Sequence, residues 1–215
     1  MARPIIIDID LDNVDPNGVF EDQTLGGAGD FTLDGAGVTG GEWITPDGFA
    51  KQIGFESTGN ISGVTFTVTG FADVNRHVAL TETLSGPNNN TVETTNYFYI
   101  ITSIAADGAV GTNTEAGPVD EAVTTTIPIN WRNGIAAINL DITGTINVTV
   151  QNTFDNVQDL NDLSFNWQDS PNTNLINATS STNDTYEGLP RALRLKVNSY
   201  SSGAEVQMVI HQRDQ

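Results

Sequence analysis

The residue types best suited to chemistry near the start of the chain are carboxylates. Four aspartates lie within eight residues: Asp8, Asp10, Asp12 and Asp15. Oxygen ligands at close spacing are what a Ca²⁺ loop uses, but an EF-hand also needs glycine at loop position six and glutamate at position twelve. Counted from Asp8, those positions hold Asn13 and Val19. Because Ile and Leu alternate with the acids, residues 5–12 are expected to form a strand with carboxylates on one face, which leaves open only an irregular or shared calcium site.

Zinc, nucleophilic and phosphate-binding motifs are absent from the sequence. His77 and His211 are far apart, no HExxH motif occurs and the chain has no cysteine, so neither a zinc site nor a disulfide is predicted. No G-x-S-x-G motif occurs, and the glycines of 26–29 are not followed by the Lys-Ser/Thr of a phosphate loop. With 27 acidic residues, a carboxylate pair at glycosidase spacing is inevitable and carries no information. The sequence therefore predicts no catalytic residue, no cofactor and no metal site, and we expect a protein that is not an enzyme.

Aromatic side chains offer a different kind of site. Four of them could line a sugar-binding face: Tyr97, Tyr99, Trp131 and Trp167. Such residues more often serve as core or interface anchors, because they bury a large apolar area. Both interpretations stay open from the sequence.

The basic residues cluster at one place. Arg191, Arg194 and Lys196 supply three of the eight Lys and Arg residues within six positions. In a strand, residues 194 and 196 share a face. The three side chains are expected either to neutralise carboxylates of the same chain or to form a contact patch for an acidic neighbour, including another copy of this protein.

Net charge restricts the partners. The formal charge is −19 at pH 7, which opposes binding to nucleic acid or to an anionic membrane and keeps the chain soluble. The opening residues do not resemble a signal peptide, and no apolar run reaches the length of a membrane span. We expect a protein that is made in a cytoplasm and stays or assembles there.

The elements that must position these residues are short strands. Apolar–polar alternation recurs between turn signals, and no segment shows a sustained 3.6-residue stripe. Residues 111–126 have little bulky apolar content, and we expect either a domain boundary around residues 120–128 or a long loop within one sandwich. Residues 154–163 are expected to be a short helix or loop, and 168–188 a long exposed excursion. The prediction is an all-β fold of antiparallel sandwich or barrel-like type, with two small domains in tandem at 1–125 and 126–215.

The segment from Gly63 to Ile104 has the clearest strand pattern. Val64, Phe66 and Val68 alternate with threonines, the Gly86–Asn90 cluster forms a turn, and an apolar strand is expected at 97–104. The run from ISGVTFTVTG through TETLSGPNNN to YFYIITSI resembles a pattern in small structural proteins of tailed-bacteriophage virions. QTLGGAGDFTLDG (23–35) is similar to the segment that precedes it there, and GLPRALRLKVNSYSSGAEVQMVIHQ (188–212) is similar to the closing strands of other phage virion proteins.

This resemblance implies a non-enzymatic particle component. The expected function is a head decoration, or cement, protein that stabilises the capsid shell, with the major capsid protein as partner and a homo-oligomer, such as a trimer, as the bound form. Two alternatives stay open: a tail, collar or fibre-attachment component, and a carbohydrate-binding β-sandwich module. The resemblance transfers no site residues to this chain.

Overall fold

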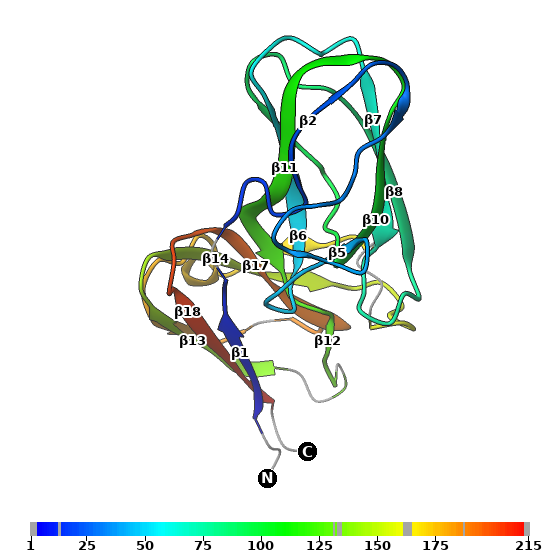
Figure 1. The fold of residues 1–215 in the computed structure, drawn as a ribbon. Coiled ribbons are helices and arrows are strands. Elements are labelled where there is room, and N and C mark those ends of the chain that lie inside the picture. Colours follow the sequence, from blue (N-terminus) through cyan, green and yellow to red (C-terminus); the bar gives the residue numbers. More distant parts are fainter. Residues whose placement is uncertain are drawn as a thin grey trace. The chain divides into compact units, whose positions relative to one another are not determined.

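The described residues of the computed structural model are 4–12, 14–130, 132, 135–160, 165–186 and 188–212. They form strands that pair in antiparallel sheets, and a single 3₁₀ turn at Thr173–Leu175 (Figure 1). This confirms the all-β, sandwich or barrel-like class. Within the described part of the chain, no helix has the length and apolar content to cross a membrane.

The chain folds as two compact units. The central unit spans Val14–Ala122, and the terminal unit combines Met1–Asn13 with Val123–Gln215. The predicted division at 125/126 placed the N-terminal strand in the first domain. In the structure β1 (Ile5–Asp10) pairs antiparallel with β18 (Glu205–Gln212), close to the other end of the chain (Figure 1). Alternation identifies a strand but does not select its partner, because many strands share the same two-residue period.

The central unit contains two groups of hydrogen-bonded strands. In the first group the order is β4-β5-β10-β7-β8, with β3 also paired to β10; the bounds are Gly29–Asp30 (β3), Val38–Thr39 (β4), Glu42–Ile44 (β5), Thr65–Phe71 (β7), Ala79–Ser85 (β8) and Ile100–Ala106 (β10). In the second group β11 neighbours β6 and β2, and β6 pairs with β9; the bounds are Phe20–Leu25 (β2), Ala50–Ser57 (β6), Thr91–Glu93 (β9) and Val110–Val123 (β11).

The predicted alternation of residues 64–69 is confirmed in β7. Phe66 and Val68 are fully buried, whereas Thr65 is exposed and Thr67 and Thr69 are half-buried. Phe66 packs in an aromatic cluster in which the rings of Phe20 and Phe31 stack 4.4 Å apart. Full burial of one such side chain contributes about 1.5–3 kcal/mol. The hydroxyl face of the hairpin pairs Thr67 with Thr83 of β8.

A long loop over residues 111–126, one of the two alternatives for this segment, is wrong for most of its length, whereas the two units divide after Ala122, within the range given for a domain boundary. Residues 110–123 form β11, a 14-residue strand. Small residues are used here because neighbouring backbone approaches closely: a Cβ added at Gly117 would lie 2.0 Å from the Asp15 carbonyl oxygen. Low bulk on the strand therefore reflects tight packing rather than irregular structure.

A buried ion pair lies at the turn before β6. Lys51 Nζ is 2.6 Å from Asp47 Oδ2, and both side chains are only 1% exposed. The Thr45 hydroxyl and the Phe49 amide also donate to Asp47 Oδ1, at 2.9 and 3.2 Å. Burying two charges is costly unless they are paired and further hydrogen-bonded. The stability of this turn therefore depends on the ion pair and on both hydrogen bonds to Asp47.

The terminal unit is built from two further sets of strands. The first set has the order β1-β18-β13-β16, with β13 at Ile135–Thr143 and β16 at Thr182–Asp184. In the second set β14 (Ile146–Thr153) lies between β15 (Gln168–Asp169) and β17 (Ala192–Tyr200), and β12 (Ile127–Pro128) also pairs with β17. The predicted short helix or loop at 154–163 is irregular over residues 154–160, and residues 161–164 lie outside the described part. The predicted excursion at 168–188 contains β15, the 3₁₀ turn and β16.

Gly70 allows β7 and β10 to pair closely, and its substitution tests the register. Gly70 lies opposite Ile101, and a Cβ there would be 1.9 Å from the Ile100 carbonyl oxygen. Because backbone would have to move, we expect Gly70→Ala to lower the free energy of unfolding by about 1–3 kcal/mol in chemical denaturation.

Gly111→Ala is the matched control, since Gly111 is an exposed strand residue with open space at its Cβ position. Its effect should stay within about 0.5 kcal/mol. Equal stability of the two variants would contradict the close approach of β7 and β10.

Candidate functional site

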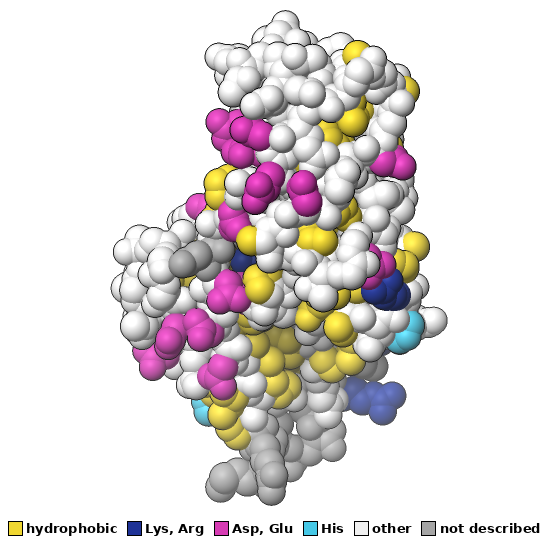
Figure 2. Space-filling model, viewed as in Figure 1, with side chains coloured by type: hydrophobic (Ala, Val, Ile, Leu, Met, Phe, Trp, Pro, Cys, Tyr) yellow, Lys and Arg dark blue, Asp and Glu magenta, His cyan; other side chains and the backbone are white. Residues whose placement is uncertain are grey.

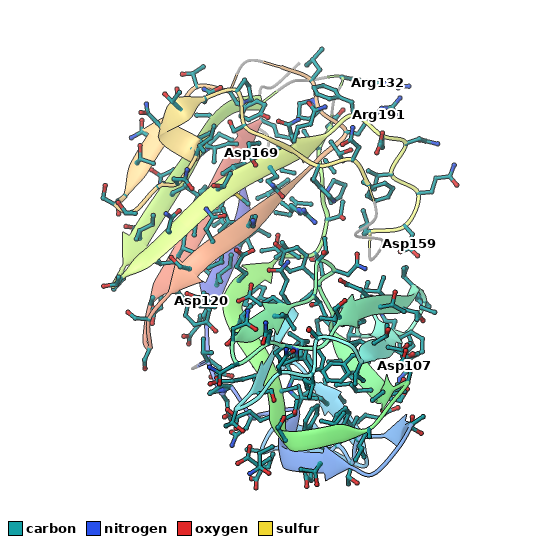
Figure 3. The ribbon with its side chains drawn as sticks, turned by 90° about the horizontal axis from the view of Figure 1, so that it is seen from above. Asp107, Asp120, Arg132, Asp159, Asp169 and Arg191 are labelled. Atoms are coloured by element: carbon teal, nitrogen blue, oxygen red, sulfur yellow. The ribbon has the colours of Figure 1, made fainter. Side chains whose placement is uncertain are left out.

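The three basic residues singled out in the sequence do not form one exposed patch. Arg191 lies just before β17 and is exposed (labelled in Figure 3), Lys196 is half-buried, and Arg194 is only 7% exposed. Residues 194 and 196 share a strand face, as predicted. The Arg194 guanidinium contacts Gln151 and Trp167 of the terminal unit.

Arg194 belongs to a cross-strand row formed by Asp169, Gln151 and Arg194, which we call the Arg194 row. Pairing places Gln151 of β14 opposite Asp169 of β15 on one side and opposite Arg194 of β17 on the other. Gln151 Nε2 donates to Asp169 Oδ1 at 2.9 Å, and Arg194 Nε donates to Gln151 Oε1 at 2.8 Å. The neutral amide thus connects a cation to an anion two strands away, and hydrogen bonds to charged groups are among the stronger ones.

An aromatic ring covers the cation of this row. The Arg194 guanidinium carbon lies 4.5 Å from the centroid of Trp167, whose own ring packs against Phe165 at 6.3 Å in a T-shaped arrangement. A guanidinium over an indole face is an attractive contact that strengthens when water is excluded. Trp167 is therefore a packing residue of the terminal unit.

A small cavity lies beside the Arg194 row, where β14 ends. It measures about 180 Å³, and we call it the Asn152 pocket; its lining residues are Asn152, Phe154, Gln168, Asp169, Pro171, Tyr186 and Gly188. Asp169, labelled in Figure 3, belongs to both the row and the pocket. The position of Asn152 is fixed by β-pairing with Gln168 and Leu193.

The wall of this pocket is buried and ordered by a tyrosine. Tyr186 and Asn152 are each 3% exposed, and the Tyr186 hydroxyl donates to Asn152 Oδ1 at 2.6 Å. Burial raises the pKa of Tyr186 to about 12, an effect that a hydrogen bond from Ser170 partly offsets. The phenol therefore remains protonated and serves as a fixed donor at neutral pH.

The other aromatic candidates lie elsewhere. Trp131 is outside the described residues. Tyr97 and Tyr99 belong to the central unit. The Tyr97 hydroxyl donates a hydrogen bond to Glu121 at 3.1 Å. Burial, together with the charge of Asp47, raises the pKa of Tyr99. The aromatics that line the Asn152 pocket, Phe154 and Tyr186, were not among the predicted residues. Tyr186 is the one aromatic in the polar stretch 168–188, which is the only signal that sequence reasoning could have used.

The acidic N-terminal strand carries its carboxylates on the outer sheet face, as its alternation predicted. A shallow depression of about 380 Å³ there is lined in part by Asp8, Asp10, Asp141 and Glu205. Among the described residues, no group of three or more His, Cys, Asp or Glu side chains has the arrangement to hold a metal ion. His77 is exposed and lies 4.0 Å from Asp73.

Comparisons with known proteins add little to this description. No protein-family model matches the chain, and no curated protein matches it. A search of solved structures finds the major capsid protein P2 from bacteriophage PM2, with 9% identity over 98% of this chain and 99% of that chain, and a TM-score of 0.19. Two chains with so low a TM-score do not share a superposable fold, so we draw no argument from this match.

The Arg194 row makes a stability prediction. Arg194→Met keeps a long apolar stem but removes the Gln151 hydrogen bond and the Trp167 contact, so the free energy of unfolding should fall by about 1–3 kcal/mol. Asn183→Met at an exposed position of β16 is the control and should change it by less than about 0.5 kcal/mol. Chemical denaturation measures both. Equal effects would show that the row does not stabilise the unit.

The buried phenol makes a pH prediction. The pKa of Tyr186 is about 12 in the folded chain, above the ordinary value of 10.0. Its stabilisation is complete below pH 10 and is lost toward pH 12, because the unfolded chain releases the proton first. The free energy of unfolding should therefore fall more steeply over this range in the wild type than in Tyr186→Phe. Identical slopes in alkaline denaturation curves would contradict the burial of this hydroxyl.

Proposed function

We propose that this protein is a structural component of a tailed-bacteriophage virion, specifically a decoration protein bound to the head shell. The observation that carries the proposal is the ordered resemblance of three sequence segments to phage virion proteins. Those segments coincide with framework strands: β2 and β3, then β7 to β10, then β17 and β18. The resemblance therefore involves the residues that build the sheets.

Surface chemistry supports this role. The net charge of −19 keeps free subunits apart and soluble before assembly. On the face seen in Figure 2 acidic side chains are spread widely and basic ones are few. Decoration of a shell needs only modest burial per subunit, since binding is repeated over many equivalent sites.

An edge strand offers a site for contact between subunits. β8 is the last strand in its sheet order, and none of its side chains is fully buried. Glu82 on this strand accepts backbone hydrogen bonds from Thr95 and Asn96 at 2.7 and 2.9 Å, which fixes the adjoining loop. This strand is a candidate contact surface for the major capsid protein or for other copies in a homo-oligomer such as a trimer. The exposed Arg191 is a separate candidate contact residue on the terminal unit.

The role needs no catalysis and no cofactor, and we propose a non-enzymatic protein located in the virion. A tail, collar or fibre-attachment component is the second candidate within the particle. Copy number separates the two, because a decoration protein occupies hundreds of equivalent shell positions whereas tail rings hold at most about a dozen copies.

The proposal predicts that the chain co-purifies with intact phage particles. Quantitative mass spectrometry of gradient-purified virions should find it at a copy number comparable to that of the major capsid protein. A low copy number would favour the tail component instead. Absence of the chain from purified particles, with the major capsid protein present as internal control, would rule out both virion roles.

A further inference from the structure

We infer that the Asn152 pocket of the terminal unit binds one neutral pyranose ring of a saccharide. The cavity of about 180 Å³ is smaller than the roughly 300–1,000 Å³ of pockets for drug-sized ligands, so it accommodates a single ring rather than an extended molecule. Its lining combines side-chain amides, one carboxylate and two aromatic rings. That combination recognises a ring with hydroxyls on its edge and C–H groups on its faces.

The buried wall of the pocket holds an amide in a fixed orientation. Asn152 is 3% exposed, and its Oδ1 accepts from the Tyr186 hydroxyl at 2.6 Å. An amide held in this way can donate to a sugar hydroxyl without first having to be ordered, which lowers the entropic cost of binding. The Tyr186 contact fixes which end of the amide faces the ligand.

Two further polar side chains of the lining can form hydrogen bonds with sugar hydroxyls. The Gln168 side chain is exposed and makes no hydrogen bond to a described residue. Asp169 uses Oδ1 to accept from Gln151 at 2.9 Å, so its carboxylate is held in place. Amides both donate and accept, and carboxylates accept strongly, which matches the mixed character of neighbouring sugar hydroxyls.

An exposed ring forms the apolar part of the pocket. Phe154 is 59% exposed. It lines the cavity together with Pro171. An apolar ring at the rim of a polar pocket provides a flat surface against which the C–H face of a sugar packs.

The charge of the pocket selects among ligand classes. A nucleotide or an acidic sugar is disfavoured because Asp169 lines the wall and the chain carries a net charge of −19. A divalent cation is disfavoured because the described residues of the lining contain a single carboxylate, whereas Ca²⁺ takes six to eight oxygen ligands. A neutral sugar meets neither objection.

This inference goes beyond the proposed virion role and does not depend on it. A decoration protein with such a pocket would attach a particle to surface polysaccharide, whereas the same pocket on a protein absent from particles would still bind the sugar. Failure of co-purification and failure of sugar binding are separate results.

The test uses the purified full chain and a panel of methyl glycosides of glucose, galactose, mannose and N-acetylglucosamine, with glucuronic acid as the acidic comparator. Saturation-transfer NMR detects binding and titration calorimetry measures Kd. We expect at least one neutral glycoside to bind with Kd on the order of 1 mM and glucuronic acid to bind more weakly.

Matched variants locate the site. Phe154→Ala and Gln168→Ala, both at exposed positions, should each weaken binding about tenfold, the equivalent of one lost contact. The controls are Leu189→Ala and Asn183→Ala, which remove an exposed apolar group and an exposed amide outside the pocket lining and should leave Kd unchanged. Absence of binding across the neutral panel, equal or tighter binding of glucuronic acid, or equal loss in pocket and control variants would overturn the inference.

Discussion

The terminal unit depends on the register of β14 between β15 and β17. That register places Gln151 opposite both Asp169 and Arg194, so a single amide joins a carboxylate and a guanidinium across three strands. One residue further along, it brings Asn152 opposite Gln168 at the wall of the Asn152 pocket. A slip of one residue would exchange the two faces of β14 and destroy the row and the pocket together.

The central unit satisfies a different constraint, because its core contains charge as well as aromatic rings. Stacked phenylalanines fill the space between its strands, and the Lys51–Asp47 pair lies buried at the turn before β6. Such a pair is weak evidence for net stability, but once buried it strongly penalises any conformation that separates its members. The buried pair thus fixes the conformation of the turn before β6.

The two proposals rest on different kinds of observation. The virion role rests on a resemblance carried by framework strands and on surface charge, whereas the saccharide pocket rests on geometry in the terminal unit alone. The Arg194 row connects the pocket to the fold, since Asp169 belongs to both. Arg194 was a reasonable candidate for a contact residue, because cationic side chains are usually exposed; here Trp167 and Gln151 enclose it.

The sequence by itself determined the all-β class, the alternating strand over residues 64–69 and the acidic outer face of β1, because each depends on local alternation. Only the tertiary structure decided that β1 pairs with β18, that residues 110–123 are a strand and that Arg194 is buried. These features depend on which strands meet and how closely their backbones approach, and a two-residue period is the same for every candidate partner. The Asn152 pocket belongs to this second group, since its lining residues come from three separate stretches of the chain that only the tertiary structure brings together.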